Sequence, residues 1–148
     1  MKSTTTRFAA SVIAIAIPFA PSVAHAETKP AERPAYQRQQ AEHLTADIAA
    51  ASVKTSSATL TAQQKLVVSN AIESAHTAAL QALTAYESVL LADEYAIGQA
   101  RERLVHSRVA LDAAAAEARS ARDIVPANAT TLAAALDAII FDLEALLD

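Results

Sequence analysis

The chain contains no cysteine and no tryptophan, and it has a single glycine, Gly98, and a single methionine, Met1. Without cysteine it cannot form disulfides, carry a lipoprotein anchor or attach haem through C-x-x-C-H. One glycine cannot build a phosphate-binding loop or the elbow of a nucleophilic serine. The sequence therefore predicts a protein without enzymatic activity, without a cofactor and without a structural metal.

The first 26 residues have the features of a cleavable secretory signal. Lys2 and Arg7 precede an uncharged apolar run from Phe8 to Ala20, and Ala24-His25-Ala26 offers small residues at a cleavage site. The run is shorter than the roughly 20 residues that a membrane-spanning helix needs, so cleavage after Ala26 is favoured over a retained anchor. We expect a secreted or periplasmic protein of the bacterial cell envelope.

Removal of residues 1–26 leaves 122 residues with 10 basic and 16 acidic side chains. The negative balance disfavours nucleic acid and anionic membrane surfaces as partners. No second apolar run is long enough to span a bilayer, so stable membrane insertion after cleavage is not expected. Residues 27–34 are charged and contain two prolines, which predicts a disordered lead-in. Residues 35–148 are enough for a single domain with its own core.

Alanine supplies 32 of the 122 residues after Ala26, and most of the others are also good helix formers. This composition predicts an all-α fold, a small Ala-rich bundle of three to four helices. The first helix is expected to run to about Val53 and to break at the hydroxyl-rich segment 55–59. Thr61 and Gln64 form a capping-box pattern that should begin the second helix.

Residues 62–123 allow two interpretations, because they contain no proline and no cluster of turn residues. Apolar residues recur every seven positions, which suits one helix of about 90 Å. A hairpin with a turn near residues 93–98 would instead give a compact bundle, and it is slightly favoured because a lone helix would need a partner along its middle. The recurring residues are Leu83, Leu90, Ile97, Leu104 and Leu111.

The segment 125–131 holds a proline followed by residues able to cap a new helix. The last helix then has an apolar stripe at spacings of four and three, which predicts that it packs in the core. Its opposite face should be acidic and exposed. The stripe comprises Leu132, Leu136, Ile139, Leu143 and Leu146, and the acidic face comprises Asp137, Asp142, Glu144 and Asp148.

Residues 110–147 combine an Ala-rich helix, a P-x-N-A-T linker at 126–130 and an A-L-x-x-x-x-x-x-L spacing from Ala135. In these features they resemble the last two helices of FIVAR-type modules, the three-helix repeats of Gram-positive surface proteins. The aromatic signature of the first half of that family is missing, since the chain has no tryptophan. The resemblance implies an extracellular binding or spacer module without chemistry.

Three side chains are candidate metal ligands. Glu73 and His76 stand at i, i+3 on one helical face, and His106 follows Glu102 at i, i+4. Di-iron bundles use such pairs, but they need two complete motifs and further carboxylates from other helices. Solvated side chains are therefore favoured over a metal site.

Arg101, Arg103 and Arg108 form the candidate ligand-binding patch, because arginine clusters can hold carboxylate or phosphate groups. Acidic residues alternate with these arginines along the segment 101–123. Their spacing suits i, i+4 ion pairs, so a salt-bridged exposed face is favoured.

These observations favour an exported, non-enzymatic helical protein that binds another envelope protein, a glycan or a wall component. The alternative is a carrier of a small ligand or metal that uses the interior of the bundle. Oligomer formation stays open, and the sequence does not distinguish the periplasm from the extracellular medium.

Overall fold

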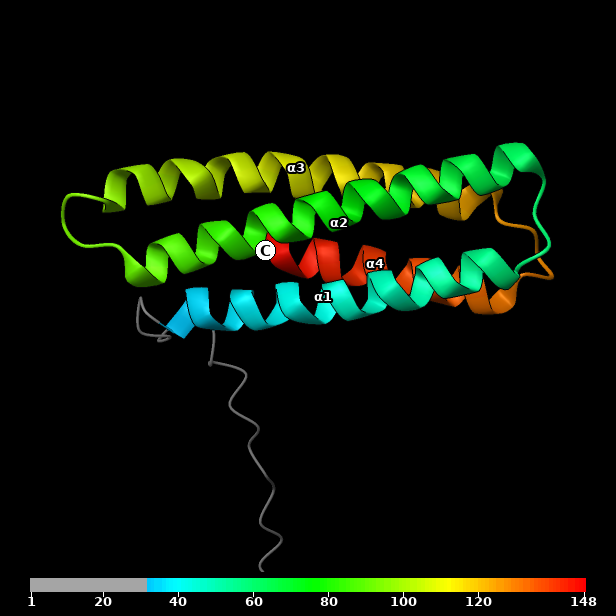
Figure 1. Cartoon of the computed structure of the whole chain (residues 1–148), viewed down its shortest axis with the longest axis horizontal. Coiled ribbons are helices and arrows are strands. Elements are labelled where there is room, and N and C mark those ends of the chain that lie inside the picture. The colour runs from blue at the N-terminus through cyan, green and yellow to red at the C-terminus, as the bar shows by residue number, and fades with distance from the viewer. Residues whose placement is uncertain (1–31) are drawn as a thin grey trace, which may run out of the picture.

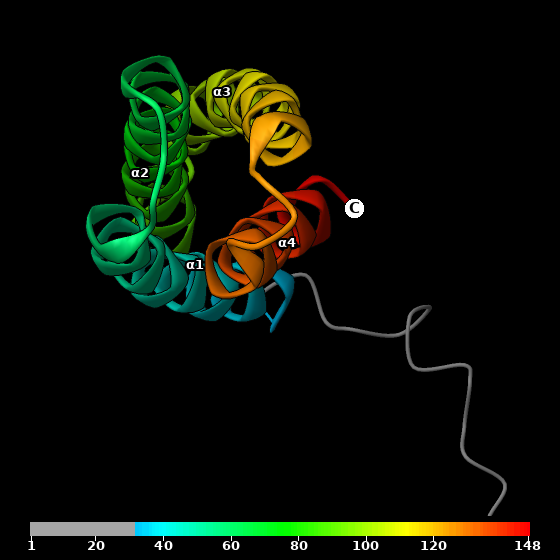
Figure 2. The ribbon, with the colours of Figure 1, turned by 90° about the vertical axis from the view of Figure 1, so that its right-hand side faces the viewer.

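The computed structural model describes residues 32–148, which form a bundle of four helices in which successive helices run antiparallel (Figure 1). Each helix packs on two neighbours, and α1 on α4 closes the ring (Figure 2). The predicted all-α bundle is confirmed, while the expected signal 1–26 and residues 27–31 lie outside the described range. The helices are α1 (Glu32–Ser57), α2 (Ala62–Leu91), α3 (Ile97–Ile124) and α4 (Thr130–Leu147).

The two ends of α1 differ from the prediction. The helix begins at Glu32, so the last three residues of the expected lead-in are helical. Pro34 is accommodated because the first N–H groups of a helix have no intrahelical partner. At the other end α1 continues to Ser57, because the hydroxyls that were expected to break it donate to carbonyls within the helix. Thr55 Oγ1 donates to Ala51 O at 2.9 Å.

The connection to α2 contains the predicted capping box. Gln64 N donates to Thr61 Oγ1 at 3.2 Å, and Thr61 N donates to Gln64 Oε1 at 3.0 Å. The amide of Gln64 also donates to the carbonyl oxygen of Ile124 at the end of α3, at 3.0 Å. One side chain therefore caps α2 and ties it to its neighbour.

Residues 62–123 form a hairpin, which excludes the single long helix. Asp93 makes the turn, since its Oδ1 accepts hydrogen bonds from the backbone N–H groups of Tyr95 (3.1 Å) and Ala96 (2.9 Å). Gly98 lies inside the first turn of α3, and its φ is not positive. The chain therefore reverses through the Asp93 carboxylate and not through the glycine.

The core has an alanine side and a leucine side. Most buried residues of α2 and α3 are alanines. Of the leucines that recur every seven residues, Leu111 is fully buried, whereas Leu83 is partly buried and Leu90 is 38% exposed. The predicted burial of the α4 stripe is confirmed. All five of its members are at most 1% exposed: Leu132, Leu136, Ile139, Leu143 and Leu146.

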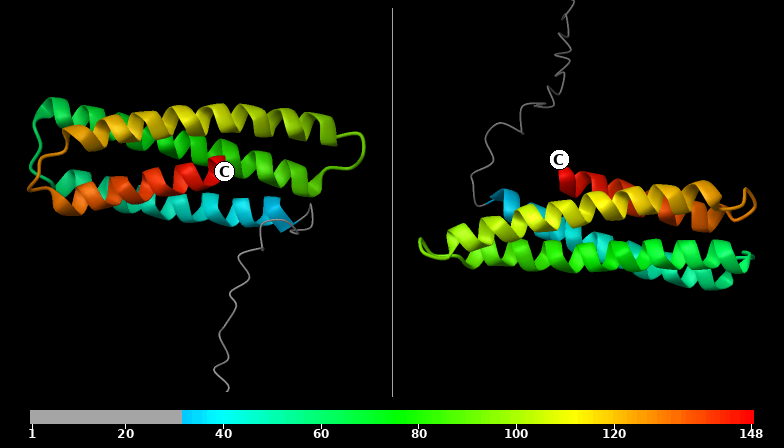
Figure 3. Two further views of the ribbon diagram at one scale, coloured as in Figure 1. Left: turned by 180° about the vertical axis from the view of Figure 1, so that it is seen from behind. Right: turned by 90° about the horizontal axis from the view of Figure 1, so that it is seen from above.

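Helix α4 is much shorter than α2 and α3. It has 18 residues against 30 in α2, or about 27 Å against about 45 Å. It therefore ends partway along the bundle, and α2 and α3 continue past its end (Figure 3).

The N-cap of α4 is Ala129, which offers no side-chain hydrogen bond, contrary to the expected cap. Among residues 32–148, no helix is both long and apolar enough to cross a membrane.

Candidate functional site

Asp142 is the most unusual member of the core. It is only 4% exposed and belongs to the buried stripe of α4, three residues after Ile139 and four before Leu146. The expectation that it lies on the exposed acidic face is wrong. A carboxylate in such a place is costly unless a charged or hydrogen-bonding partner offsets the loss of hydration.

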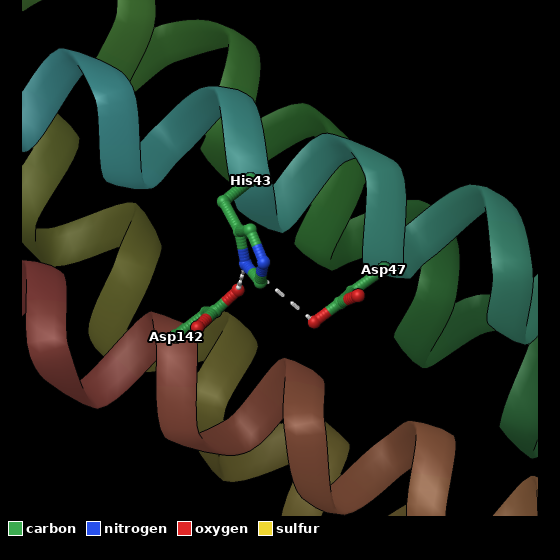
Figure 4. A group of neighbouring side chains, drawn as sticks. All are labelled: His43, Asp47 and Asp142. Carbon is green, nitrogen blue, oxygen red and sulfur yellow. Dashed lines mark hydrogen bonds and ion pairs between the residues drawn. The ribbon is translucent and has the colours of Figure 1, made fainter.

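The partner comes from α1. His43 Nδ1 lies 2.8 Å from Asp142 Oδ2, and it lies 3.8 Å from Oδ2 of Asp47, one turn later on α1. The imidazole thus stands between two carboxylates from different helices (Figure 4). Side-chain exposure is 65% for His43, 28% for Asp47 and 5% for Asp142. We call these three residues the His43 cluster.

The cluster favours positive charge at its centre. The hydrogen bond to Asp142 is the main cause that raises the pKa of His43 above its ordinary value, followed by the negative charges of Asp142 and Asp47. The small loss of hydration acts in the opposite direction. The two carboxylates therefore stabilise a protonated imidazole or, in its place, a bound cation.

Sequence reasoning missed this cluster, although signals for its parts were present. Asp142 follows Ala135 by seven residues and falls in phase with the core stripe, and His43 precedes Asp47 by one helical turn. The pairing of α1 with α4 was needed to join them. Among residues 32–148, this is the one group of three or more potential metal ligands whose donor atoms converge, all lying within 4.8 Å of one another.

The second candidate region is a groove between α1 and α2, with a volume of about 440 Å³. Ile48 and Ile72 are nearly buried at its floor, and polar side chains surround them. We call it the α1–α2 groove. Its lining consists of Thr45, Ile48, Ala49, Ser52, Thr55 and Ser56 of α1 with Lys65, Ser69, Ile72, Glu73 and His76 of α2.

Two of the three predicted metal ligands, Glu73 and His76, line this groove. Both side chains are exposed. His106 is exposed on α3 and does not line the groove. The structure thus brings Glu73 and His76 to one surface but does not gather all three predicted ligands into a converging group.

Two of the three arginines of the predicted patch bind different neighbouring helices. Arg103 donates to Ser88 Oγ of α2 at 2.9 Å. Arg108 donates to the carbonyl oxygen of Leu147, at the end of α4. Arg101 is exposed near the start of α3. Arg103 and Arg108 therefore support neighbouring helices, and the three guanidinium groups do not face one ligand.

The ion pairs of the α3 arginines differ from the prediction, because in residues 32–148 they cross to α4 and do not form within α3. Arg119 Nη2 of α3 lies 2.6 Å from Glu144 Oε1 of α4, and Arg122 Nε lies 2.8 Å from Asp137 Oδ1. In the part of the chain that the structure describes, α3 contains none of the expected i, i+4 ion pairs. The arginines instead line the seam between α3 and α4, where α4 presents its acidic face.

No protein-family model matches this chain, and comparisons with curated proteins and with solved structures likewise give no match. The resemblance to FIVAR-type modules stays a prediction.

Proposed function

We propose that this chain is an exported, non-enzymatic binding protein of the cell envelope and that its α1–α2 groove binds a partner protein. The observation that carries the proposal is the groove itself, whose apolar floor is surrounded by polar and charged side chains. A concave surface of this kind is the usual starting point for recognition. Export rests on the signal-like residues 1–26.

The charged side chains of the groove are not paired with one another or with neighbouring residues of the range 32–148, unlike the arginines between α3 and α4. Between α3 and α4, Arg119 and Arg122 are engaged by acidic residues. In the groove, the side chains of Lys65, Glu73 and His76 form no hydrogen bond or ion pair with any residue of the range 32–148. These groups can therefore pair with a partner without first breaking an internal contact.

The lining favours a protein over a glycan. Nearly buried Ile48 and Ile72 offer an apolar centre, and Lys65 and Glu73 offer charges of both signs at the edge. Protein interfaces commonly have such an apolar centre and polar rim. The groove has no phenylalanine, tyrosine or tryptophan ring on which the face of a sugar could stack.

Site-specific photo-crosslinking in the native host tests the groove. A photoreactive residue at Ser69 should yield a discrete protein adduct, which excess unlabelled purified protein suppresses. The matched control is the same residue at Ala134, an exposed position of α4 outside the groove. Equal adducts at both positions, or no adduct at Ser69, would contradict the proposal that the groove binds the partner. An adduct whose added mass is removed by glycan hydrolases, and which yields peptides of this chain alone, would replace the protein partner with a glycan.

Export is tested independently by mass spectrometry of the host fractions. We expect a mature N-terminus at Glu27 in the periplasm or medium. Protein that retains Met1 and stays with the membrane would contradict export.

A further inference from the structure

We propose that the His43 cluster binds Zn²⁺ and that the ion joins α1 to α4. This inference goes beyond the proposed binding function, because the cluster lies on the seam between α1 and α4 and none of its residues lines the α1–α2 groove. It also departs from the expectation of a protein without metal.

The ligand atoms fit the ion in kind and in spacing. Imidazole nitrogen and carboxylate oxygen are both common zinc ligands, with bonds of about 2.0–2.2 Å. Around a tetrahedral ion of that size, two ligand atoms lie about 3.3 Å apart. The distances from His43 Nδ1 to the two carboxylates, 2.8 Å and 3.8 Å, lie on either side of this value. The ligand atoms of all three residues lie within 4.8 Å of one another, so the side chains must draw closer together to bind the ion.

The two helices supply complementary parts of the site. His43 and Asp47 are one turn apart on α1, so their side chains leave the same helical face. Asp142 approaches from α4 (Figure 4). Three protein ligands leave a fourth position for water, and the 65% exposure of His43 gives the ion an entry path from solvent.

The burial of Asp142 is a further reason to expect a cation here. Its side chain is 95% buried, and its partner within the described chain is the exposed His43, whose Nδ1 lies 2.8 Å from Oδ2. A single exposed imidazole is a modest offset for a buried carboxylate with Asp47 nearby. A divalent ion at the centre would neutralise both carboxylates at once.

The ligand set selects against the common hard cations. Ca²⁺ and Mg²⁺ are bound through oxygen ligands, with six or more positions filled. A site with one imidazole and two carboxylates offers too few oxygens for them, whereas it suits zinc and neighbouring transition metals.

Calorimetric titration of the metal-free, untagged exported protein with Zn²⁺ tests the proposal. We expect one ion per chain, a higher melting temperature with zinc, and no binding of Mg²⁺. His43→Ala and Asp47→Asn should each weaken zinc binding at least about tenfold. Because both side chains are partly or largely exposed, these variants are expected to keep the helical fold, which circular dichroism checks.

His76→Ala and His106→Ala are the matched controls, since each removes an exposed histidine outside the cluster. Both should bind zinc like the parent. Absence of zinc binding by the parent, or unchanged affinity in His43→Ala and Asp47→Asn, would overturn the proposal. Loss of binding in His76→Ala alone would assign the metal to the groove instead.

Discussion

At the scale of single residues, the burial of Asp142 opposes the cost of dehydrating a carboxylate to the gain from its hydrogen bond with His43. On the buried stripe of α4 it is flanked by the buried apolar residues Ile139, Leu143 and Leu146, whereas its hydrogen-bonding partner His43 is exposed. Removing one partner of such a pair leaves a buried charge without compensation, whereas replacing the buried charge with an apolar side chain removes the cost of dehydration. Removal of the partner His43 should therefore lower the stability of the fold, and replacement of Asp142 by an apolar residue should raise it.

We expect Asp142→Leu to raise the free energy of unfolding by about 1 kcal/mol in zinc-free buffer, and His43→Ala to lower the melting temperature. Chemical denaturation in the presence of a chelator measures both. The double variant should match Asp142→Leu alone, because His43 then has no buried partner to serve. A lower stability of Asp142→Leu than of His43→Ala would contradict this account.

Gly98 offers a second comparison at the same scale. A Cβ added there would meet no atom within 4 Å beyond the adjacent residues and the backbone of its own helix, and the backbone does not have a positive φ. Gly98→Ala should therefore raise the free energy of unfolding by about 0.5 kcal/mol, by restricting the unfolded chain. Urea denaturation should show a smaller change for the adjacent exposed variant Gln99→Ala. A destabilised Gly98→Ala would mean that the start of α3 needs a glycine.

At the scale of the helices, the three connections use different local chemistry. The capping box of Thr61 and Gln64 begins α2, and the carboxylate of Asp93 closes the turn before α3. Helix α4 begins at Thr130, and its N-cap Ala129 offers no side-chain hydrogen bond; before it, Ala129 N donates to Pro126 O at 2.9 Å. The beginning of α4 must therefore depend more on packing than the beginning of α2.

Thr61→Ala should lower the free energy of unfolding by about 1 kcal/mol, because it removes the hydroxyl that accepts from Gln64 N. Thr61→Ser keeps that oxygen and should be close to the parent. Thr59→Ala, an exposed change two residues earlier, is the control. The prediction fails if Thr61→Ala and Thr59→Ala unfold at the same denaturant concentration.

At the scale of the whole molecule, stability depends on the apolar stripe of α4. Alanines line much of α2 and α3, so the large side chains of α4 supply much of the apolar volume of the core. The arginines of α3 then cover the acidic face of α4 from outside. Loss of a large α4 side chain should leave a cavity that the small neighbouring residues cannot fill.

Ile139→Ala should cost about 2–5 kcal/mol of unfolding free energy. Ile139 is 1% exposed, whereas Phe141, two residues later, is 71% exposed. Phe141→Ala should accordingly change stability by less than about 0.5 kcal/mol. Thermal denaturation followed by circular dichroism compares the two. If Ile139→Ala melts like the parent, α4 is not docked in the core.

Particular residues show how far the sequence predicts the site. The i, i+4 spacing of His43 and Asp47 can be seen without a structure, and so can the phase of Asp142 with the α4 stripe. Neither pattern says that α1 and α4 are neighbours. The exposure of His76 and the divergence of Arg103 and Arg108 also depend on neighbouring helices, which helical periodicity does not identify.

Local interactions determined the all-α fold, the capping box at Thr61 and the buried face of α4, since each depends on residues within a few turns of one another. Tertiary structure decided what periodicity leaves open. The seven-residue spacing continues through the turn at Asp93, so only the packing of α2 on α3 separates a hairpin from a long helix. The packing of α1 on α4 likewise decides that Asp142 is buried beside His43, because a helical pattern defines a face but not what covers it.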